Sequence, residues 1–226
     1  MKQAHAFIKT LLPFAFILVA GSPASQAAGA EKYLFYLHGK IIEDLGIPRP
    51  RSEKFGYYEY EKILETFRKR GFTVHSGMRP ANTNVAAYAE KVAGEIKKIL
   101  RTGVPPDRIT VVGASKGGVI AILISALLQN PNIHFVFLAN CYEAALKNLQ
   151  EMRTQVAGNI LSIYDSADDT GCGSCQDFFN SARGKKLGRT KEIVLNLGLG
   201  HGILYRPLPE WMEPVVAWAS EAAKGK

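Results

Sequence analysis

The segment 111–118, VVGASKGG, decides the fold, because an apolar run leads into it and another, 119–124, follows it at once. Gly113, Ser115 and Gly117 stand within it at G-x-S-x-G spacing. A turn that passes sharply from a strand into a helix leaves little room for side chains two residues before and after its centre, which favours glycine there. Ser115 therefore either lies in an ordinary tight turn or is held out towards a substrate by one.

From residue 33 onward, short apolar runs typical of strands alternate with runs of helical periodicity. The expected strands are residues 33–38, 71–77, 108–113, 133–139, 159–164 and 192–197. The expected helices are residues 57–70, a segment capped by Thr83 or Asn84, 116–128, 142–152, 175–183 and 209–223. Strands that are apolar throughout and alternate with helices indicate a parallel sheet covered on both faces. The sequence therefore predicts an α/β fold, a three-layer α/β/α sandwich with a mainly parallel six-stranded sheet.

The turn-rich stretch 40–56, KIIEDLGIPRPRSEKFG, is the longest irregular segment of the expected domain. Long loops without secondary structure are uncommon in compact domains unless they serve a function. We therefore interpret this stretch as a functional flap.

Residues 1–30 have the layout of a secretory signal peptide, with a basic head, an apolar middle, small residues before the cut and no acidic side chain. Residues 28–30 (AGA) offer an A-x-A cleavage site and residues 25–27 (SQA) a second one. The apolar block 11–20 is too short to span about 30 Å of hydrocarbon, which argues against a membrane anchor. We expect an exported protein, periplasmic or secreted, whose single domain comprises residues 31–226.

The charge of the chain is mildly basic. The formal net charge of +8 becomes +6 without the expected signal peptide, because that segment holds two lysines, Lys2 and Lys9, and no acid. Such an excess usually lies on a solvated surface, and the sequence has no aromatic-and-basic motif of a nucleic-acid module. It also has no dinucleotide fingerprint after the first expected strand and no clustered metal-ligand spacing. We expect neither a nucleic-acid partner nor a cofactor.

Three cysteines, Cys141, Cys172 and Cys175, would meet the oxidising compartment that export implies, where disulfides persist. The CGSC motif at 172–175 could instead serve redox chemistry, since a C-x-x-C arrangement can lower a thiol pKa. That motif belongs near the start of a βαβ unit, whereas here it lies late in the chain, in a loop. We expect a structural disulfide. Cys141–Cys175 is preferred, because both should lie in loops at the same end of neighbouring strands, and Cys172–Cys175 is the rival.

A serine becomes a nucleophile at neutral pH only with a base, and the base needs an acid that orients it. His201 lies in the glycine-rich LGLGHG after the last expected strand, whereas His75 and His134 lie inside strand patterns. His201 is therefore the expected base for Ser115. Three acids follow the fifth expected strand and are, in order of preference, Asp168, Asp165 and Asp169.

The preference among these acids rests on their distance from the strand. Asp168 lies four residues beyond Tyr164, the last residue of the expected strand, so its loop can curl back towards the histidine. Asp165 would then cap the strand end, and Asp169 would face solvent. An ionised carboxylate at 168 would hold the imidazole tautomer and stabilise the imidazolium.

The order serine, aspartate, histidine, each just beyond a separate strand, resembles the α/β-hydrolase superfamily over nearly all of residues 33–223. The resemblance implies a minimal member with six parallel strands and no inserted lid domain. The backbone N–H of Lys116, at the start of the helix, would be one donor to an oxyanion. The resemblance implies that Lys40, or else Gly39, supplies the second N–H, and that His38 orients this loop.

The resemblance also implies acyl transfer, in which Ser115 attacks an ester or related carbonyl and His201 takes its proton. Lys116 is a departure, since members often carry an aromatic or apolar residue at this place. Its cation either attracts an anionic substrate or pairs with a carboxylate such as Glu43. Three loop arginines either bind an acidic group or simply face solvent: Arg49, Arg51 and Arg79.

We expect a serine hydrolase, in particular a carboxylesterase acting on a small ester; a lipase, thioesterase or peptidase is the alternative within that class. Two hypotheses from other classes stay open. A catalytically silent binding protein is one, because fold does not imply function. A thiol–disulfide oxidoreductase that uses Cys172 and Cys175 is the other.

Overall fold

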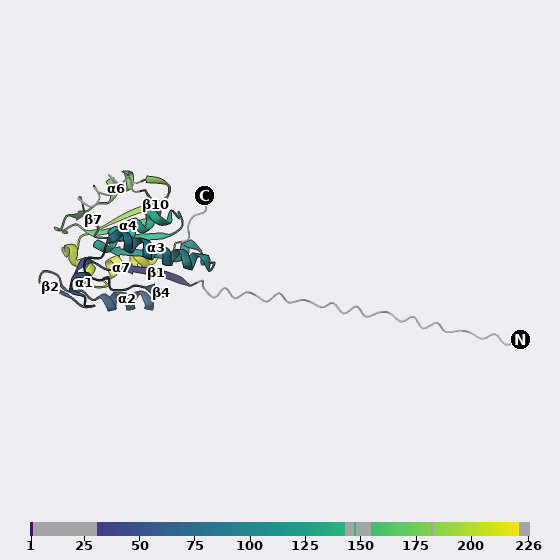
Figure 1. Cartoon of the computed structure of the whole chain (residues 1–226), viewed down its shortest axis with the longest axis horizontal. Coiled ribbons are helices and arrows are strands. Elements are labelled where there is room, and N and C mark those ends of the chain that lie inside the picture. Colours follow the sequence, from purple (N-terminus) through teal and green to yellow (C-terminus); the bar gives the residue numbers. More distant parts are fainter. Residues whose placement is uncertain (2–30, 143–146, 148–154, 182, 222–226) are drawn as a thin grey trace. The chain divides into compact units, whose positions relative to one another are not determined.

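The central layer of the structure is a sheet of six strands in the order β10-β8-β6-β5-β1-β4, with every neighbouring pair parallel. The strands are β1 (Lys32–Leu37), β4 (Phe72–His75), β5 (Ile109–Ala114), β6 (His134–Leu138), β8 (Val156–Asp165) and β10 (Arg183–Leu195). β10 and β4 form the two edges of the sheet (Figure 1). The expected α/β fold with a parallel six-stranded sheet is confirmed.

This is a computed structural model, and it describes residue 1 and residues 31–142, 147, 155–181 and 183–221. The chain divides into two units, residues 1–30 and 31–226, and the sheet belongs to the second. The expected signal peptide lies outside the described residues. No helix in the described ranges is long and apolar enough to cross a bilayer.

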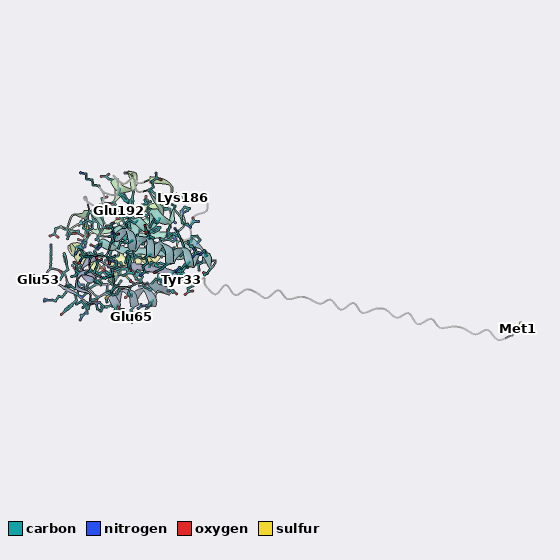
Figure 2. All side chains as sticks on the ribbon, viewed as in Figure 1. Met1, Tyr33, Glu53, Glu65, Lys186 and Glu192 are labelled. Carbon is teal, nitrogen blue, oxygen red and sulfur yellow. A yellow bond between two sulfur atoms is a disulfide. The ribbon has the colours of Figure 1, made fainter. Side chains whose placement is uncertain are left out.

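Helices cover both faces of the sheet. They are α1 (Lys40–Leu45), α2 (Tyr60–Lys69), α3 (Val85–Arg101), α4 (Lys116–Leu128), α6 (Gln176–Ser181) and α7 (Pro209–Trp218). Buried side chains of α1, α2 and α7 form one core cluster, and those of α3, α4 and α6 form a second. Apolar side chains that alternate between the two faces of a strand serve both clusters, which explains why β5 is buried along its whole length. Charged side chains such as Glu53, Glu65 and Lys186 are exposed at the periphery (Figure 2).

The segment around the decisive turn forms as expected, with β5 running to Ala114 and α4 starting at Lys116. Of the two caps considered for the helix that became α3, Asn84 is the one that acts. Its side chain accepts a hydrogen bond from the Ala87 N–H at 3.0 Å, which satisfies one of the free donors at the start of α3.

The stretch 40–56 is not an irregular flap, and that expectation was wrong. It contains α1 and a small antiparallel hairpin of β2 (Arg51–Ser52) and β3 (Gly56–Tyr57). α1 has only six residues and ends at Gly46, whose φ of 63° suits glycine and whose N–H bonds the Ile42 carbonyl. An element so short shows no readable periodicity.

The last strand was also placed wrongly, at 192–197 instead of 183–195. β10 pairs only with β8 and has two register irregularities, so polar residues such as Arg189 and Lys191 interrupt the apolar pattern at this edge. The strand stops at Leu195, and the Leu197 N–H donates to the Asp165 carboxylate instead.

A further two-stranded sheet was not expected. β7 (Cys141–Tyr142) and β9 (Cys172–Gly173) pair antiparallel, with Tyr142 opposite Cys172. Most of the helix expected at 142–152 lies outside the described residues. Cys141 and Cys175 form a disulfide with their Cα atoms 5.4 Å apart, which leaves Cys172 as a buried free thiol.

The disulfide should be a major source of stability, because it closes a segment with a sequence separation of 34. A loop of this length corresponds to about 3–4 kcal/mol of lost unfolded-state entropy. We expect the double substitution Cys141→Ala and Cys175→Ala to lower the free energy of unfolding by about that amount in urea titrations. Cys172→Ala is the matched control and should cost clearly less; equal losses in both variants would contradict this account.

Candidate active site

Ser115 lies at the turn between β5 and α4 with φ 52° and ψ −121°, a conformation that residues other than glycine rarely adopt. Strain of this kind costs of order 1–3 kcal/mol and persists only where the surroundings enforce it. The Ser115 N–H donates to the Leu138 carbonyl at 2.9 Å. A Cβ at Gly113 would collide with the Gly117 carbonyl, so the chain turns here as tightly as the glycine spacing requires.

The loop after β1 lies beside this turn. A Cβ at Gly39 would come within 3.6 Å of the Ser115 Cβ, and Gly117 packs directly against the Leu37 carbonyl. Lys40 and Lys116 are the first residues of α1 and α4. Their backbone N–H groups therefore belong to helix first turns, whose donors have no partner inside the helix.

His38 is a buried residue that holds this loop. Its Nδ1 lies 2.8 Å from the Gly39 carbonyl oxygen and its Nε2 lies 3.0 Å from the Arg79 N–H. A carbonyl accepts and an N–H donates, so the proton of the neutral imidazole is on Nδ1. Burial, and then the charge of Arg79, lower the pKa of His38 to about 4. The ring is therefore a neutral structural group at physiological pH.

Asp168 and His201 meet at the edge of the sheet where the strands end, with Asp168 Oδ2 2.8 Å from His201 Nδ1. Asp168 Oδ1 also accepts hydrogen bonds from the Thr170 N–H and hydroxyl, at 3.0 and 2.6 Å. Burial acts to raise the pKa of this carboxyl, but the hydrogen bonds from His201 and Thr170 outweigh it and lower the pKa. Asp168 thus stays ionised beside the imidazole.

The other two acids considered at this strand end have different surroundings. Asp165 is fully buried, and its carboxylate accepts backbone N–H groups of Ala167, Leu197 and Gly200 at 2.8–3.0 Å. These bonds fix the loop that leads to His201. Asp169 is exposed and pairs with Lys54. Of the three, only Asp168 contacts the histidine.

Ser115 and His201 line the same pocket of about 190 Å³. Its other lining residues are Gly39, Lys40, Ile41, Tyr58, Leu204 and Tyr205. A larger hollow of about 480 Å³, lined by residues that include Pro48, Arg49 and Tyr60, contains neither Ser115 nor His201. The smaller pocket is therefore the one in which a substrate could reach the serine.

Tyr142 contacts the serine and was not singled out from the sequence. Its hydroxyl lies 2.5 Å from Ser115 Oγ, whereas no hydrogen bond joins Ser115 to His201 in the described part of the chain. Burial raises the pKa of Tyr142 well above its ordinary value, so the phenol stays protonated. The one available signal was position, since Tyr142 follows closely on the fourth core strand at the edge where the other candidates lie.

The Lys116 side chain pairs with a carboxylate, one of the two alternatives left open. Its ammonium contacts Glu43 and donates to the Thr83 carbonyl at 3.0 Å. Arg79 Nε lies 3.1 Å from the other oxygen of Glu43. Burial acts to raise the pKa of Glu43, but hydrogen bonds from Lys116 and Arg79 lower it.

The loop arginines differ in their surroundings. Arg79 is buried, contrary to both expectations for it, because it neutralises Glu43 inside the protein. Arg49 and Arg51 are exposed beside the ring of Tyr57, with the Arg49 guanidinium carbon 4.3 Å from the ring centroid.

Cys172 and Thr170 are further polar neighbours of the histidine. The Cys172 Sγ lies 3.8 Å from His201 Nδ1 and donates to the Ala139 carbonyl at 3.1 Å. Burial raises the pKa of this thiol to about 11, against the opposing effect of its hydrogen bonds with Thr170 and Tyr142.

The strand order, the helices on both faces and the strained serine turn after β5 are those of the α/β-hydrolase fold. Solved structures agree with this assignment. SOBER1 from Arabidopsis thaliana superposes with a TM-score of 0.56 at 12% identity, covering 84% of this chain and 98% of that one. The esterase Pf2001 from Pyrococcus furiosus gives 0.58 at 14% identity, covering 86% of this chain and 82% of that one.

A lipase-esterase related protein from Clostridium acetobutylicum gives a TM-score of 0.53 at 14% identity, with coverage of 83% of this chain and 94% of that one. No protein-family model and no curated protein sequence matches the chain. At these identities the structural likeness establishes the fold of the chain.

Proposed function

We propose that the protein is a serine hydrolase that cleaves a small ester, with Ser115 as nucleophile, His201 as base and Asp168 as the orienting acid. The observation that carries the proposal is the Asp168–His201 hydrogen bond of 2.8 Å at the pocket that Ser115 also lines. Two of the structural neighbours are described as an esterase and as a lipase-esterase related protein, which supports ester hydrolysis over other acyl transfer.

The first half of the reaction forms an acyl-enzyme. Asp168 occupies His201 Nδ1, so Nε2 is the nitrogen left to accept the proton from Ser115 Oγ. The hydroxyl leaves Tyr142 and turns towards His201 as substrate enters. Oγ then bonds to the carbonyl carbon, and the carbonyl electron pair moves onto oxygen. Collapse of this intermediate expels the alkoxide, which takes the proton from Nε2.

The second half repeats these steps with water. His201 Nε2 takes a proton from water, the resulting hydroxide attacks the acyl carbon, and Ser115 Oγ recovers the proton as the acid leaves. We propose that the oxyanion of each intermediate accepts two hydrogen bonds. One comes from the backbone N–H of Lys116 and the other from that of Lys40 or Gly39. The close approach of Gly39 to Ser115 supports this assignment. Such donors typically contribute a few kcal/mol each in a dry site.

A neutral substrate fits the charges at this edge better than an anionic one. The Lys116 ammonium and the Arg79 guanidinium are both committed to Glu43, and Lys40 pairs with Asp44 at 2.5 Å. The apolar lining from Ile41, Leu204 and the tyrosine rings suits a short acyl or alkyl group.

The two alternatives have less support. A thiol–disulfide oxidoreductase would need a reactive pair at 172 and 175, but Cys175 is bonded to Cys141 and the pKa of the Cys172 thiol is raised to about 11 by burial. A silent binding protein would not need the strained backbone at Ser115, which is costly to maintain.

We also propose that the protein is exported and loses residues 1–30, on the strength of the layout of that segment. The Cys141–Cys175 disulfide agrees with an oxidising compartment.

Export predicts that the protein recovered from its native cells begins at residue 31, or at residue 28 if the second site is used. Intact mass and amino-terminal sequencing measure this directly. Recovery from the cytoplasm with Met1 still in place would contradict it.

Fluorophosphonate labelling tests the catalytic assignment. We expect the wild type to be labelled at Ser115 and Ser115→Ala to remain unlabelled. Asp168→Asn should lower p-nitrophenyl ester turnover by roughly 10³-fold or more, because the imidazole loses its orienting carboxylate. Asp169→Asn, a neighbouring exposed acid, is the matched control and should retain full turnover. Labelling that persists in Ser115→Ala would reject the assignment.

Tyr142→Phe tests the resting hydrogen bond. If the Tyr142 hydroxyl must release Ser115 before attack, removing it should speed labelling by up to about tenfold, since a neutral hydrogen bond is worth roughly 0.5–1.5 kcal/mol. The labelling rate of Tyr142→Phe should be compared with that of Tyr205→Phe, which changes a tyrosine lining the Ser115 pocket. Slower labelling in Tyr142→Phe would mean that the hydroxyl assists the reaction instead.

A further inference from the structure

Three side chains with metal-ligating atoms meet around His201 Nδ1. Asp168 Oδ2, Cys172 Sγ and His201 Nδ1 all lie within 4.8 Å of one another. The proposed reaction uses the first and the last, but it has no use for the thiol. The thiol is available because Cys175 takes Cys141 as its disulfide partner.

We propose that this cluster is an inhibitory site for a thiophilic divalent cation, with Zn²⁺ as the best fit; the inhibitory role rests on the proposed hydrolase function. Tetrahedral zinc with bonds of 2.0–2.3 Å needs its ligand atoms about 3.4–3.6 Å apart. The Sγ–Nδ1 distance is 3.8 Å and the Oδ2–Nδ1 distance is 2.8 Å. The third pair, Asp168 Oδ2 and Cys172 Sγ, lies within 4.8 Å. Changes of up to about 1 Å in these three separations would bring the atoms to zinc-binding positions.

The donor set selects the kind of cation. One sulfur, one imidazole nitrogen and one carboxylate oxygen suit zinc, whereas calcium and magnesium prefer oxygen ligands alone. Cys172 is buried, and the Asp168 and His201 side chains are only 0% and 12% exposed, so bulk water competes little for these atoms.

Thr170 offers the way in. It is exposed, and its hydroxyl lies 3.2 Å from His201 Nδ1 and 3.5 Å from Cys172 Sγ. Rotation of this surface side chain would break its hydrogen bond of 2.6 Å to Asp168 Oδ1 and open a fourth position to water. Zinc sites with three protein ligands and one open position are common.

Occupation of this site would stop the proposed reaction. The cation bonds to Nδ1 and to Sγ, and the protons of Nδ1 and of the thiol pass to solvent. His201 then loses its hydrogen bond to Asp168. The positive charge on the ring also makes Nε2 a poorer base towards Ser115.

Metal titrations of the purified mature protein test the site. Zn²⁺ competition against a chromophoric chelator should show one equivalent bound, and Co²⁺ should give the near-ultraviolet charge-transfer absorption of a thiolate ligand. Cys172→Ala should weaken zinc binding by at least about 10-fold, the lower figure for losing even an outer-shell partner of a metal site. Asp169→Ala, which removes an exposed acid next to Asp168, is the matched control and should bind as the wild type does.

The result separates the site from the proposed function. Ser115→Ala should bind zinc as tightly as the wild type, whether or not the protein hydrolyses esters. In the active wild type, zinc should abolish turnover and excess chelator should restore it, while Cys172→Ala should keep turnover at the same zinc concentration. Equal zinc affinity in Cys172→Ala, or no cobalt–thiolate absorption in the wild type, would overturn the site. Thiol-dependent binding with unchanged turnover would overturn its inhibitory role.

Discussion

The close approach of α4 to the end of β1 is the contact on which the candidate site depends. Gly117 lies so near the carbonyls of Leu37 and His38 that a Cβ there would overlap both. β1 and β5 are parallel neighbours with Leu37 opposite Gly113, so the loops that follow these strands leave the sheet side by side. The missing side chain at 117 lets these loops touch. In a parallel sheet the loops that follow the strands share one edge. Here the lack of a Cβ at Gly117 lets α4 come close enough for Gly39 to lie against Ser115.

The buried carboxylate of Glu43 also holds these loops together. Glu43 forms ion pairs with Arg79 and Lys116. Arg79 also donates a hydrogen bond of 2.5 Å to the His38 carbonyl. These contacts tie α1, the segment before α3 and the first turn of α4 to one another. Breaking a buried pair of this kind typically costs about 3–5 kcal/mol, because the remaining charge is left without a partner. If they were exposed, the side chains of Arg79 and Lys116 would suggest anion binding. Because they pair with buried Glu43, they instead fix the backbone N–H groups next to Ser115.

The parts of the fold predictable from sequence are those in which one long pattern has one physical cause. β5, α4 and the glycine spacing around Ser115 were readable because burial on both faces makes their apolar runs continuous. The contact of Asp168 with His201 agrees with the distance of Asp168 along its loop. The helix α1 and the two-residue strands β7 and β9 were missed, because they show no readable period and are set by tertiary contacts. The polar edge strand β10 was misplaced for a related reason, because an edge does not require apolar residues on both faces.

The short strands β7 and β9 place two side chains, Tyr142 and Cys172, at the candidate site. β7 and β9 have two residues each and form an isolated two-stranded sheet. A ribbon of that size is not stable by itself in water. The covalent bond from Cys141 to Cys175 anchors it, because Cys141 is adjacent to Tyr142 and Cys175 lies two residues beyond β9. The anchored ribbon carries the hydroxyl that contacts Ser115 on one strand and the thiol beside His201 on the other. The disulfide therefore fixes the surroundings of both Ser115 and His201.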